Sequence, residues 1–274
     1  MPPKLGVIAG GGPLPLRVVE KCRQDERAVF AVVLEGQADA ADYAETDHVA
    51  LRLGAAGAAI KRLRAEGCEI LVLAGWVRRP SLAELRPDWW AVKFFAASGA
   101  DALGDDGLLK ALLRALEKEG FNVIGADEIV PELLMPVGVI GSIEPAPDMQ
   151  ADIAAAVAAA RDLGRRDIGQ GAVVRNGDII AAERADGTDA MLSRLVETGN
   201  KGGVLAKVLK PGQERRVDLP TVGPETVRNA ARAGLAGIVI DAGNAFLMDA
   251  EATRAAADGA SLFILGVAAD EAAL

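Results

Sequence analysis

Charged and polar side chains that could do chemistry gather in residues 181–227, a stretch interspersed with glycine and proline. Carboxylates at strand ends and in loops are usual ligands of Mg²⁺, which also takes substrate phosphate oxygens. Lysine is a common partner of phosphate. The stretch therefore indicates acid–base and metal chemistry on a phosphorylated substrate. Its members are Glu183, Asp186, Asp189, Lys201, Lys207, Lys210, Gln213, Arg215, Arg216 and Asp218.

Lys207 lies inside an apolar strand pattern, "VLAKVLK", over residues 204–210. Alternation places it on one face of the strand with Leu205 and Leu209. A buried lysine is costly without an anionic partner. Two explanations stay open: an edge strand protected by an inward-facing lysine, or a lysine directed at a phosphate.

Aspartates at two further positions are candidate ligand-binding residues. Asp218 ends the basic segment "ERRVD", which we expect to be a short strand, and its position at the strand exit suits a Mg²⁺ ligand. Asp105 and Asp106 in "GDDGLL" (104–109) fall where a helix begins. Carboxylates in a first turn stabilise a helix by about 0.5–2 kcal/mol, so capping and ligand binding both stay open.

A glycine turn follows the first apolar run in "GVIAGGGPLP" (6–15). Gly10 and Gly12 supply the first pair of a dinucleotide fingerprint and Glu35 could supply its acidic residue, but Pro15 stands where the third glycine belongs. Backbone N–H groups at a helix start favour an anion. The turn could therefore bind a phosphate or sugar, bind NAD(P), or bind nothing.

Composition narrows the class of protein. The 274 residues are 51% hydrophobic with a net charge of −9, which predicts a sizeable core and no nucleic-acid partner. Cys22 and Cys68 occupy apolar settings and are expected to be reduced core residues. His48 is the one histidine, which excludes histidine-rich metal centres. No N-terminal signal and no apolar run of about 20 residues is visible, so we expect a cytoplasmic protein.

The elements that must position these residues alternate between strand and helix. Short Val/Ile/Leu runs separated by amphipathic stretches predict a Rossmann-like parallel-sheet α/β domain over 1–140. A linker follows over 141–150, and a mixed α/β domain over 151–274 carries the charged segment. Within it, "GAVVRNGDIIAAE" (171–183) predicts a β-hairpin with a type I′ turn at Asn176 and Gly177.

These motifs together resemble the LpxI-type UDP-2,3-diacylglucosamine pyrophosphatases of lipid A biosynthesis. The resemblance follows family order through almost the whole chain and is most specific over 201–227. Two small departures occur, in "RAD" before Gly187 and in the Gly75-Trp76 pair, where Trp76 could alter the shape of the ligand cleft. The matching segments are "GVIAGGGPLP", "AGWVRRPSL" (74–82), "GDDGLL", "DIGQGAVV" (167–174), "ADGTDAMLSR" (185–194) and "KGGVLAKVLKPGQERRVDLPTVGPETV" (201–227).

The resemblance implies a Mg²⁺-dependent hydrolase that splits UDP-2,3-diacylglucosamine into UMP and 2,3-diacylglucosamine 1-phosphate (lipid X), with water attacking the β-phosphate. It implies two domains with the lipid product held in a cleft between them. Peripheral contact with the cytoplasmic face of the inner membrane and a homodimer stay open. The segment "WWAVKFFAASGA" (89–100) is either a lipid-meeting surface or a core helix. An NAD(P)-linked oxidoreductase and a non-catalytic nucleotide-sugar or lipid binding protein are the alternatives.

Residue roles follow from this resemblance together with the residue chemistry. We expect Asp218 to be the essential metal ligand or water-orienting carboxylate, with Asp189 and Glu183 as further metal ligands. Lys207 and Lys210 would offset phosphate charge, and Gln213 would position the water or a phosphate oxygen. The expected substrate contacts are Gly10, Gly11, Gly12, Leu14, Asp105, Asp106, Thr188 and Lys201.

Overall fold

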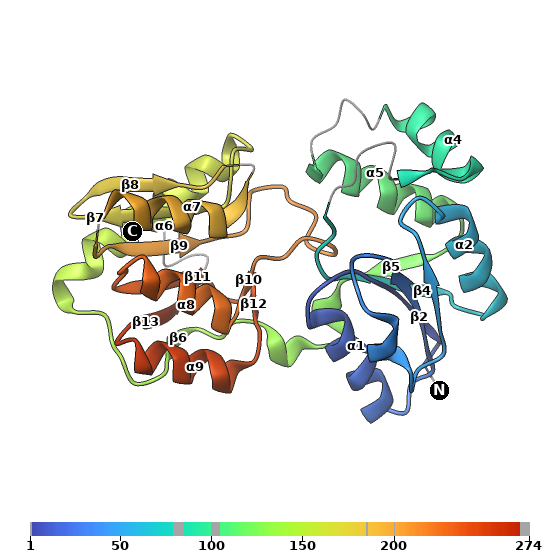
Figure 1. The fold of residues 1–274 in the computed structure, drawn as a ribbon, viewed down its shortest axis with the longest axis horizontal. Helices are drawn as coiled ribbons and strands as arrows, with labels where there is room; N and C mark the ends of the chain where they lie inside the picture. The colour runs from blue at the N-terminus through green and yellow to red at the C-terminus, as the bar shows by residue number, and fades with distance from the viewer. Residues whose placement is uncertain (1, 79–84, 100–104, 185, 200, 269–274) are drawn as a thin grey trace. The chain divides into compact units, whose positions relative to one another are not determined.

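The computed structural model describes residues 2–78, 85–99, 105–184, 186–199 and 201–268 (Figure 1). The chain divides into two compact units. The N-terminal unit comprises Met1–Pro131 and Glu214–Asp218, and the C-terminal unit comprises Glu132–Gln213 and Leu219–Leu274. The linker expected from the sequence, at residues 141–150, lies further along the chain than Pro131, where the main part of the N-terminal unit ends.

The N-terminal unit is built on a five-stranded parallel sheet with the strand order β3-β2-β1-β4-β5. Its central strands are continuous apolar runs because both faces of the sheet are covered. The order is that of a doubly wound dinucleotide-binding sheet without its sixth strand. The strands are β1 (Leu5–Ala9), β2 (Val29–Leu34), β3 (His48–Leu51), β4 (Ile70–Ala74) and β5 (Asn122–Ile124).

Helices cover this sheet on both faces. Phe30, Val32 and Leu71 on one face pack with residues of α2 (Ala56–Ala65) and α5 (Asp105–Lys118). Alternate residues of the strands face α1 (Leu14–Gln24), where Val18, Val19 and Cys22 are buried. The remaining elements are α4 (Trp89–Ser98), η1 (Ala40–Tyr43), η3 (Ala126–Glu128) and η4 (Pro131–Leu133). The Rossmann-like prediction is confirmed, and Cys22 and Cys68 are buried free thiols.

The C-terminal unit holds a six-stranded mixed sheet with the order β6-β13-β11-β9-β7-β8. The three central strands β13, β11 and β9 are parallel, and antiparallel strands flank them on both sides. A short parallel pair, β10 with β12, forms a separate two-stranded sheet. The strands are β6 (Gly138–Ile140), β7 (Gly171–Arg175), β8 (Asp178–Ala182), β9 (Val204–Lys207), β10 (Thr221–Val222), β11 (Gly237–Asp241), β12 (Phe246–Leu247) and β13 (Phe263–Val267).

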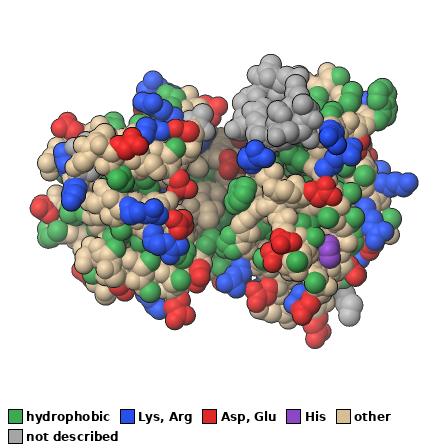
Figure 2. Space-filling model, viewed as in Figure 1, with side chains coloured by type: hydrophobic (Ala, Val, Ile, Leu, Met, Phe, Trp, Pro, Cys, Tyr) green, Lys and Arg blue, Asp and Glu red, His purple; other side chains and the backbone are tan. Residues whose placement is uncertain are grey.

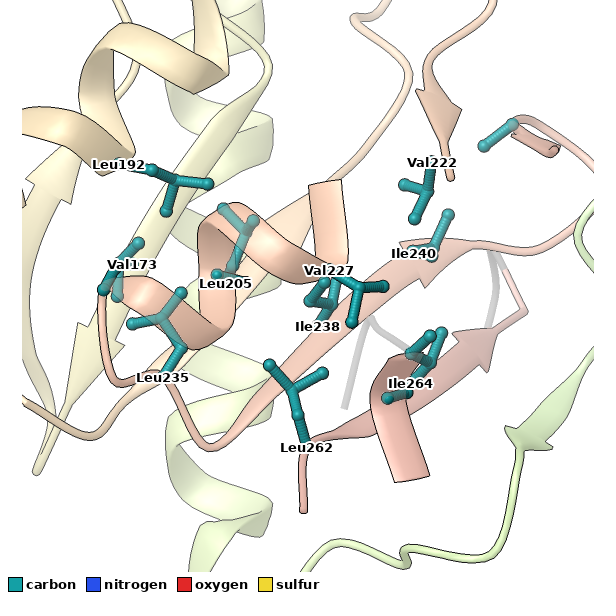
Figure 3. Close-up of a cluster of buried hydrophobic side chains, with 14 of the residues drawn as sticks. Val173, Leu192, Leu205, Val222, Val227, Leu235, Ile238, Ile240, Leu262 and Ile264 are labelled. Atoms are coloured by element: carbon teal, nitrogen blue, oxygen red, sulfur yellow. The ribbon is translucent and has the colours of Figure 1, made fainter. Parts of the chain in front are cut away.

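Two apolar clusters hold this sheet between helices. Alternate residues of β9 and β11, such as Leu205 and Ile238, join Leu192 and Val227 on one face (Figure 3). The residues of β9 and β11 that point to the opposite face, including Val204 and Val239, pack against α6. The helices are α6 (Gln150–Arg165), α7 (Gly187–Thr198), α8 (Pro224–Arg232) and α9 (Ala250–Gly259), with η5 (Pro147–Met149) before them. The mixed α/β prediction is confirmed.

The β7–β8 hairpin turns at Asn176 and Gly177, whose φ angles are +52° and +81°. Two positive φ angles are the signature of the expected type I′ turn. Among the described helices, none is long and apolar enough to cross a bilayer.

Candidate functional site

The glycine turn lies at the carboxyl edge of the N-terminal sheet, between the ends of β1 and β4. Ligands of doubly wound sheets bind at this edge, where the strand order reverses. Here the Gly11 N–H donates to the Trp76 carbonyl at 2.8 Å, and the Trp76 N–H donates to the Gly11 carbonyl at 3.0 Å. The Gly10 N–H donates to the Ala74 carbonyl at 2.8 Å. The N–H groups of Gly10 and Gly11 are therefore used within the protein.

The Trp76 indole covers the same turn. A Cβ at Gly11 would lie 2.5 Å from its Cε2, and a Cβ at Gly12 would lie 3.2 Å from its Nε1. Gly12 is the fingerprint glycine that would let a pyrophosphate approach the backbone. Trp76 explains the need for small residues here without a dinucleotide, and this geometry opposes the NAD(P) alternative. Leu14, at the start of α1, is half-buried next to this turn.

A short stretch from the second half of the chain belongs to the N-terminal unit. We call Glu214–Asp218 the docked segment. The expected strand is wrong, because Glu214–Asp218 forms a turn in which the Val217 and Asp218 N–H groups donate to the Glu214 carbonyl at 3.1 and 3.2 Å. Half-buried Val217 packs against the apolar cluster between the sheet and α2 and α5. Asp218 itself is half-buried.

Asp106 ties the docked segment to α5. Its carboxylate accepts a hydrogen bond from the Glu214 N–H at 3.2 Å and one from Lys110 Nζ at 2.6 Å. Asp105 is the first residue of α5, as its sequence position predicted, and its side chain lies outside the described residues. The observed partners of Asp106 are protein groups.

Lys207 ends β9 at the carboxyl edge of the C-terminal sheet. The edge-strand explanation for this lysine is wrong, because β9 lies between β11 and β7. Lys207 is only 8% exposed, and its Nζ donates to the Thr221 carbonyl at 3.2 Å. A lysine buried in an interior strand needs anionic surroundings.

Glu183 supplies a carboxylate beside Lys207. Gly171 pairs directly with Lys207, so the two residues project to the same face of the sheet. The side-chain space of Gly171 is filled by Glu183, whose Oε2 lies 2.7 Å from an ideal Cβ at Gly171. Thr188 Oγ1 donates to the same oxygen at 2.6 Å. Glu183, Thr188 and Lys207 therefore share one neighbourhood, with Glu183 only 6% exposed.

Lys210 and Gln213 form a turn after β9. The Lys210 N–H donates to Gln213 Oε1 at 3.0 Å, and the Gln213 N–H donates to the Lys210 carbonyl at 3.1 Å. Lys210 Nζ donates to Asp167 Oδ1 at 3.1 Å. The Gln213 side chain therefore fixes the shape of the loop that carries Lys210.

Two expected site residues lie elsewhere in this unit. Asp189 is exposed on α7, where it accepts a hydrogen bond from Asn229 Nδ2 at 2.8 Å. Lys201 is exposed before β9, at the opposite end of the strand from Lys207. In the part of the chain that the structure describes, no three His, Cys, Asp or Glu side chains gather as a metal site.

The sequence reasoning missed Asp241, at the carboxyl end of β11. It is 6% exposed, and its Oδ2 accepts a hydrogen bond from Asn244 Nδ2 at 3.2 Å. The available signal was an acidic residue ending an apolar strand, "GIVID". Such positions border ligand sites in open α/β sheets.

Charge alone would not single out this chemistry. Figure 2 shows acidic and basic side chains interspersed over the visible face of each unit. Lys207 and Asp241 stand out instead because they are buried and end the parallel strands β9 and β11, and Glu183 stands out because it is buried. The fold and these residues define a two-domain α/β protein with a Rossmann-like N-terminal unit and a lysine–carboxylate neighbourhood in its mixed C-terminal unit.

Comparison with known proteins identifies the family. The LpxI N-terminal domain matches residues 4–133, and the LpxI C-terminal domain matches residues 136–265. The UDP-2,3-diacylglucosamine pyrophosphatase LpxI of Caulobacter vibrioides (strain ATCC 19089 / CIP 103742 / CB 15) is 46% identical over 275 residues, covering 96% of this chain and 97% of that protein. The chain belongs to the LpxI family.

Two solved structures that match the chain are remote likenesses. An N5-carboxyaminoimidazole synthase from Aspergillus clavatus, in complex with ADP and 5-aminoimidazole ribonucleotide, is 15% identical with a TM-score of 0.24; the match covers 54% of this chain and 34% of that one. Glycinamide-RNase-transformylase T from Mycobacterium tuberculosis is 16% identical with a TM-score of 0.26; the match covers 66% of this chain and 44% of that one.

Proposed function

We propose that this chain is a Mg²⁺-dependent UDP-2,3-diacylglucosamine pyrophosphatase that acts at the cytoplasmic face of the inner membrane. The observation that carries the proposal is 46% identity to the Caulobacter enzyme over 96% of the chain, with both family domains matched. The buried Lys207 and Glu183 add a charged neighbourhood of the kind that phosphate chemistry needs.

The proposed reaction adds one water to the β-phosphorus, the phosphorus that carries the sugar. The bond between this phosphorus and the bridging oxygen breaks, and the bridging oxygen leaves with UMP. The sugar keeps the β-phosphate and becomes lipid X. Attack on phosphorus requires that the negative charge of the diphosphate be offset and that the water be held in line.

Lysines of the C-terminal unit can offset that charge. Lys207 Nζ is held by the Thr221 carbonyl at the end of an interior strand, so the ammonium is pre-positioned. Lys210 lies on a turn that Gln213 closes, and its Nζ contacts the exposed Asp167, a partner that a phosphate could replace. Pre-positioned cations lower the barrier because they need no reorganisation during the reaction.

Asp218 can hold Mg²⁺ or orient the water. Its carboxylate is a hard oxygen donor, and Mg²⁺ is usually bound by one or two carboxylates together with substrate phosphates, so the donor set fits without a larger acidic cluster. When bound, the ion would polarise the phosphoryl oxygens. Asp218 oxygens that are not used by the ion can accept a hydrogen bond from the water. Glu183 and Asp189, the other two ligands expected from the sequence, lie in the C-terminal unit and accept hydrogen bonds from Thr188 and Asn229.

The test is release of UMP and lipid X from purified protein and UDP-2,3-diacylglucosamine, with and without Mg²⁺. In H₂¹⁸O, attack on the β-phosphorus places the label in lipid X, whereas attack on the α-phosphorus places it in UMP. Asp218→Ala should retain substrate binding and lose Mg²⁺-dependent release by about 10²-fold or more. Tight binding of substrate by the wild-type protein without any product would instead establish a binding protein.

A further inference from the structure

The docked segment is anchored to the N-terminal unit although its neighbours on both sides belong to the C-terminal unit. Gln213 before it and Leu219 after it are C-terminal residues, whereas Glu214–Asp218 contacts α5, β5 and η3. Asp218 is the last residue of this segment. Its position therefore depends on how firmly the preceding four residues are held.

Arg216 makes the densest set of these anchors. Its Nε and Nη2 donate to the two oxygens of Glu214, each at 2.9 Å. Its Nη1 donates to Glu117 Oε1 on α5 at 2.7 Å and to the Val123 carbonyl on β5 at 3.2 Å. Guanidinium carries five N–H donors, and these four hydrogen bonds direct four of them to protein acceptors. Arg216 is thus committed to holding the segment rather than to binding a phosphate.

The contacts of Arg216 reach Asp218 through Glu214. The Glu214 carboxylate is fixed by the guanidinium, and the Glu214 carbonyl accepts the N–H groups of Val217 and Asp218. One guanidinium therefore connects β5 and α5 to the turn that ends at Asp218.

We propose that Arg216 is a positioning residue that fixes Asp218 on the N-terminal unit. The proposal rests on the proposed function, in which Asp218 orients water or holds Mg²⁺. A displacement of about 1 Å at a reacting group can lower a rate by about 10²-fold. Lysine cannot replace this arginine fully, because an ammonium lacks the planar fork that reaches Glu214 and Glu117 together.

The kinetic test compares Arg216→Ala and Arg216→Lys with the wild-type protein. Arg216→Ala should lower kcat by about 10–10²-fold with KM changed much less, and Arg216→Lys should lie between. Arg216→Ala should add little to Asp218→Ala in the double variant, because both act through one group. The matched control is Arg228→Ala, which removes an exposed arginine paired with Glu225 at 2.7 Å and should leave kcat unchanged.

Hydrogen exchange gives a readout that is independent of activity. In Arg216→Ala, peptide 214–220 should exchange at least about 10-fold faster, because the Val217 and Asp218 amides lose their fixed acceptor, while β1 amides stay protected. Unchanged exchange, or faster exchange with unchanged kcat, would overturn the proposal. If the wild-type protein releases no UMP, the proposed function fails, while faster exchange still supports the anchoring of Asp218 by Arg216.

Discussion

At the scale of single residues, sequence chemistry predicted which side chains are unusual but could not predict their partners. Lys207 stood out as a lysine in an apolar strand, and it is buried at the end of an interior strand. Glu183 comes from a different part of the chain, and it lies near Lys207 because Gly171, which pairs with Lys207, leaves room for the Glu183 carboxylate. Such proximity depends on which strands pair with each other, and the residue pattern along one strand does not reveal that pairing.

Gly171→Ala tests this neighbourhood. The added Cβ would lie 2.7 Å from Glu183 Oε2, so the carboxylate must move, although it is buried and accepts the Thr188 hydroxyl. Loss of this hydrogen bond in a buried setting should lower the free energy of unfolding by about 1–3 kcal/mol. We expect reduced UMP release as well, because Lys207 loses its neighbouring carboxylate. Urea unfolding and product release measure the two effects.

Gly259→Ala is the matched control for this substitution. A Cβ at Gly259 meets nothing within 4 Å, and the residue ends α9 without a positive φ. Alanine there should be neutral or stabilise by about 0.4–1 kcal/mol. Equal stability and activity of the two variants would contradict the role of Gly171.

At the scale of elements, long periodic segments were predictable and short ones were not. The apolar run at 29–34 and the Asn-Gly hairpin appear where the sequence places them. The three-residue strand β6 falls in a part of the chain assigned to the first domain, because its antiparallel pairing with β13 depends on residues more than a hundred positions away. Tertiary pairing outweighs local propensity for such short strands.

Helix α4 is the element whose surroundings the sequence left open. A core helix is wrong, since Ala91 is its only buried residue. Trp89 is 71% exposed and Val92 41% exposed, and Lys93 Nζ lies 5.2 Å from the centre of the Trp89 ring. Tryptophan beside a cation suits the interface of a bilayer. We expect α4 to contact the membrane that would hold a diacylated substrate.

The double variant Trp89→Ser/Val92→Ser should weaken partitioning onto phospholipid vesicles by about 10-fold or more, because each apolar side chain contributes about 1.5–3 kcal/mol when buried. Co-sedimentation with vesicles measures it. Ile179→Ser is the control, since Ile179 is 59% exposed on β8. An equal loss of vesicle partitioning in both variants would show that any exposed apolar residue contributes to binding, and α4 would have no special role.

At the scale of the whole molecule, the sequence predicted two α/β domains in the correct order and class. It did not predict that the docked segment belongs to the N-terminal unit. That assignment rests on ion pairs between residues far apart in the chain, such as Arg216 with Glu117 and Arg215 with Asp127. Many surface arginines could form such pairs, so composition cannot select them.

Acid should destabilise both units. Hydrogen bonds from neighbouring side chains are the largest cause of a lowered pKa at five carboxyl groups, which are distributed over the two units: Glu66, Glu119, Asp186, Glu214 and Glu225. A carboxyl group with a lower pKa in the folded state contributes stability above its unfolded value of about 4. This contribution is lost as the pH falls through the folded value.

We therefore expect the urea midpoint to be nearly constant from about pH 7 to 5 and to fall from about pH 4.5 to 3. Glu214→Gln should be less stable than the wild-type protein at pH 7, and the difference should shrink as the pH falls through the lowered pKa of Glu214 in the folded wild-type protein. Circular dichroism at fixed ionic strength measures both curves, because salt screens the exposed pairs. A midpoint that rises on acidification would show that these ion pairs do not govern the stability of the molecule.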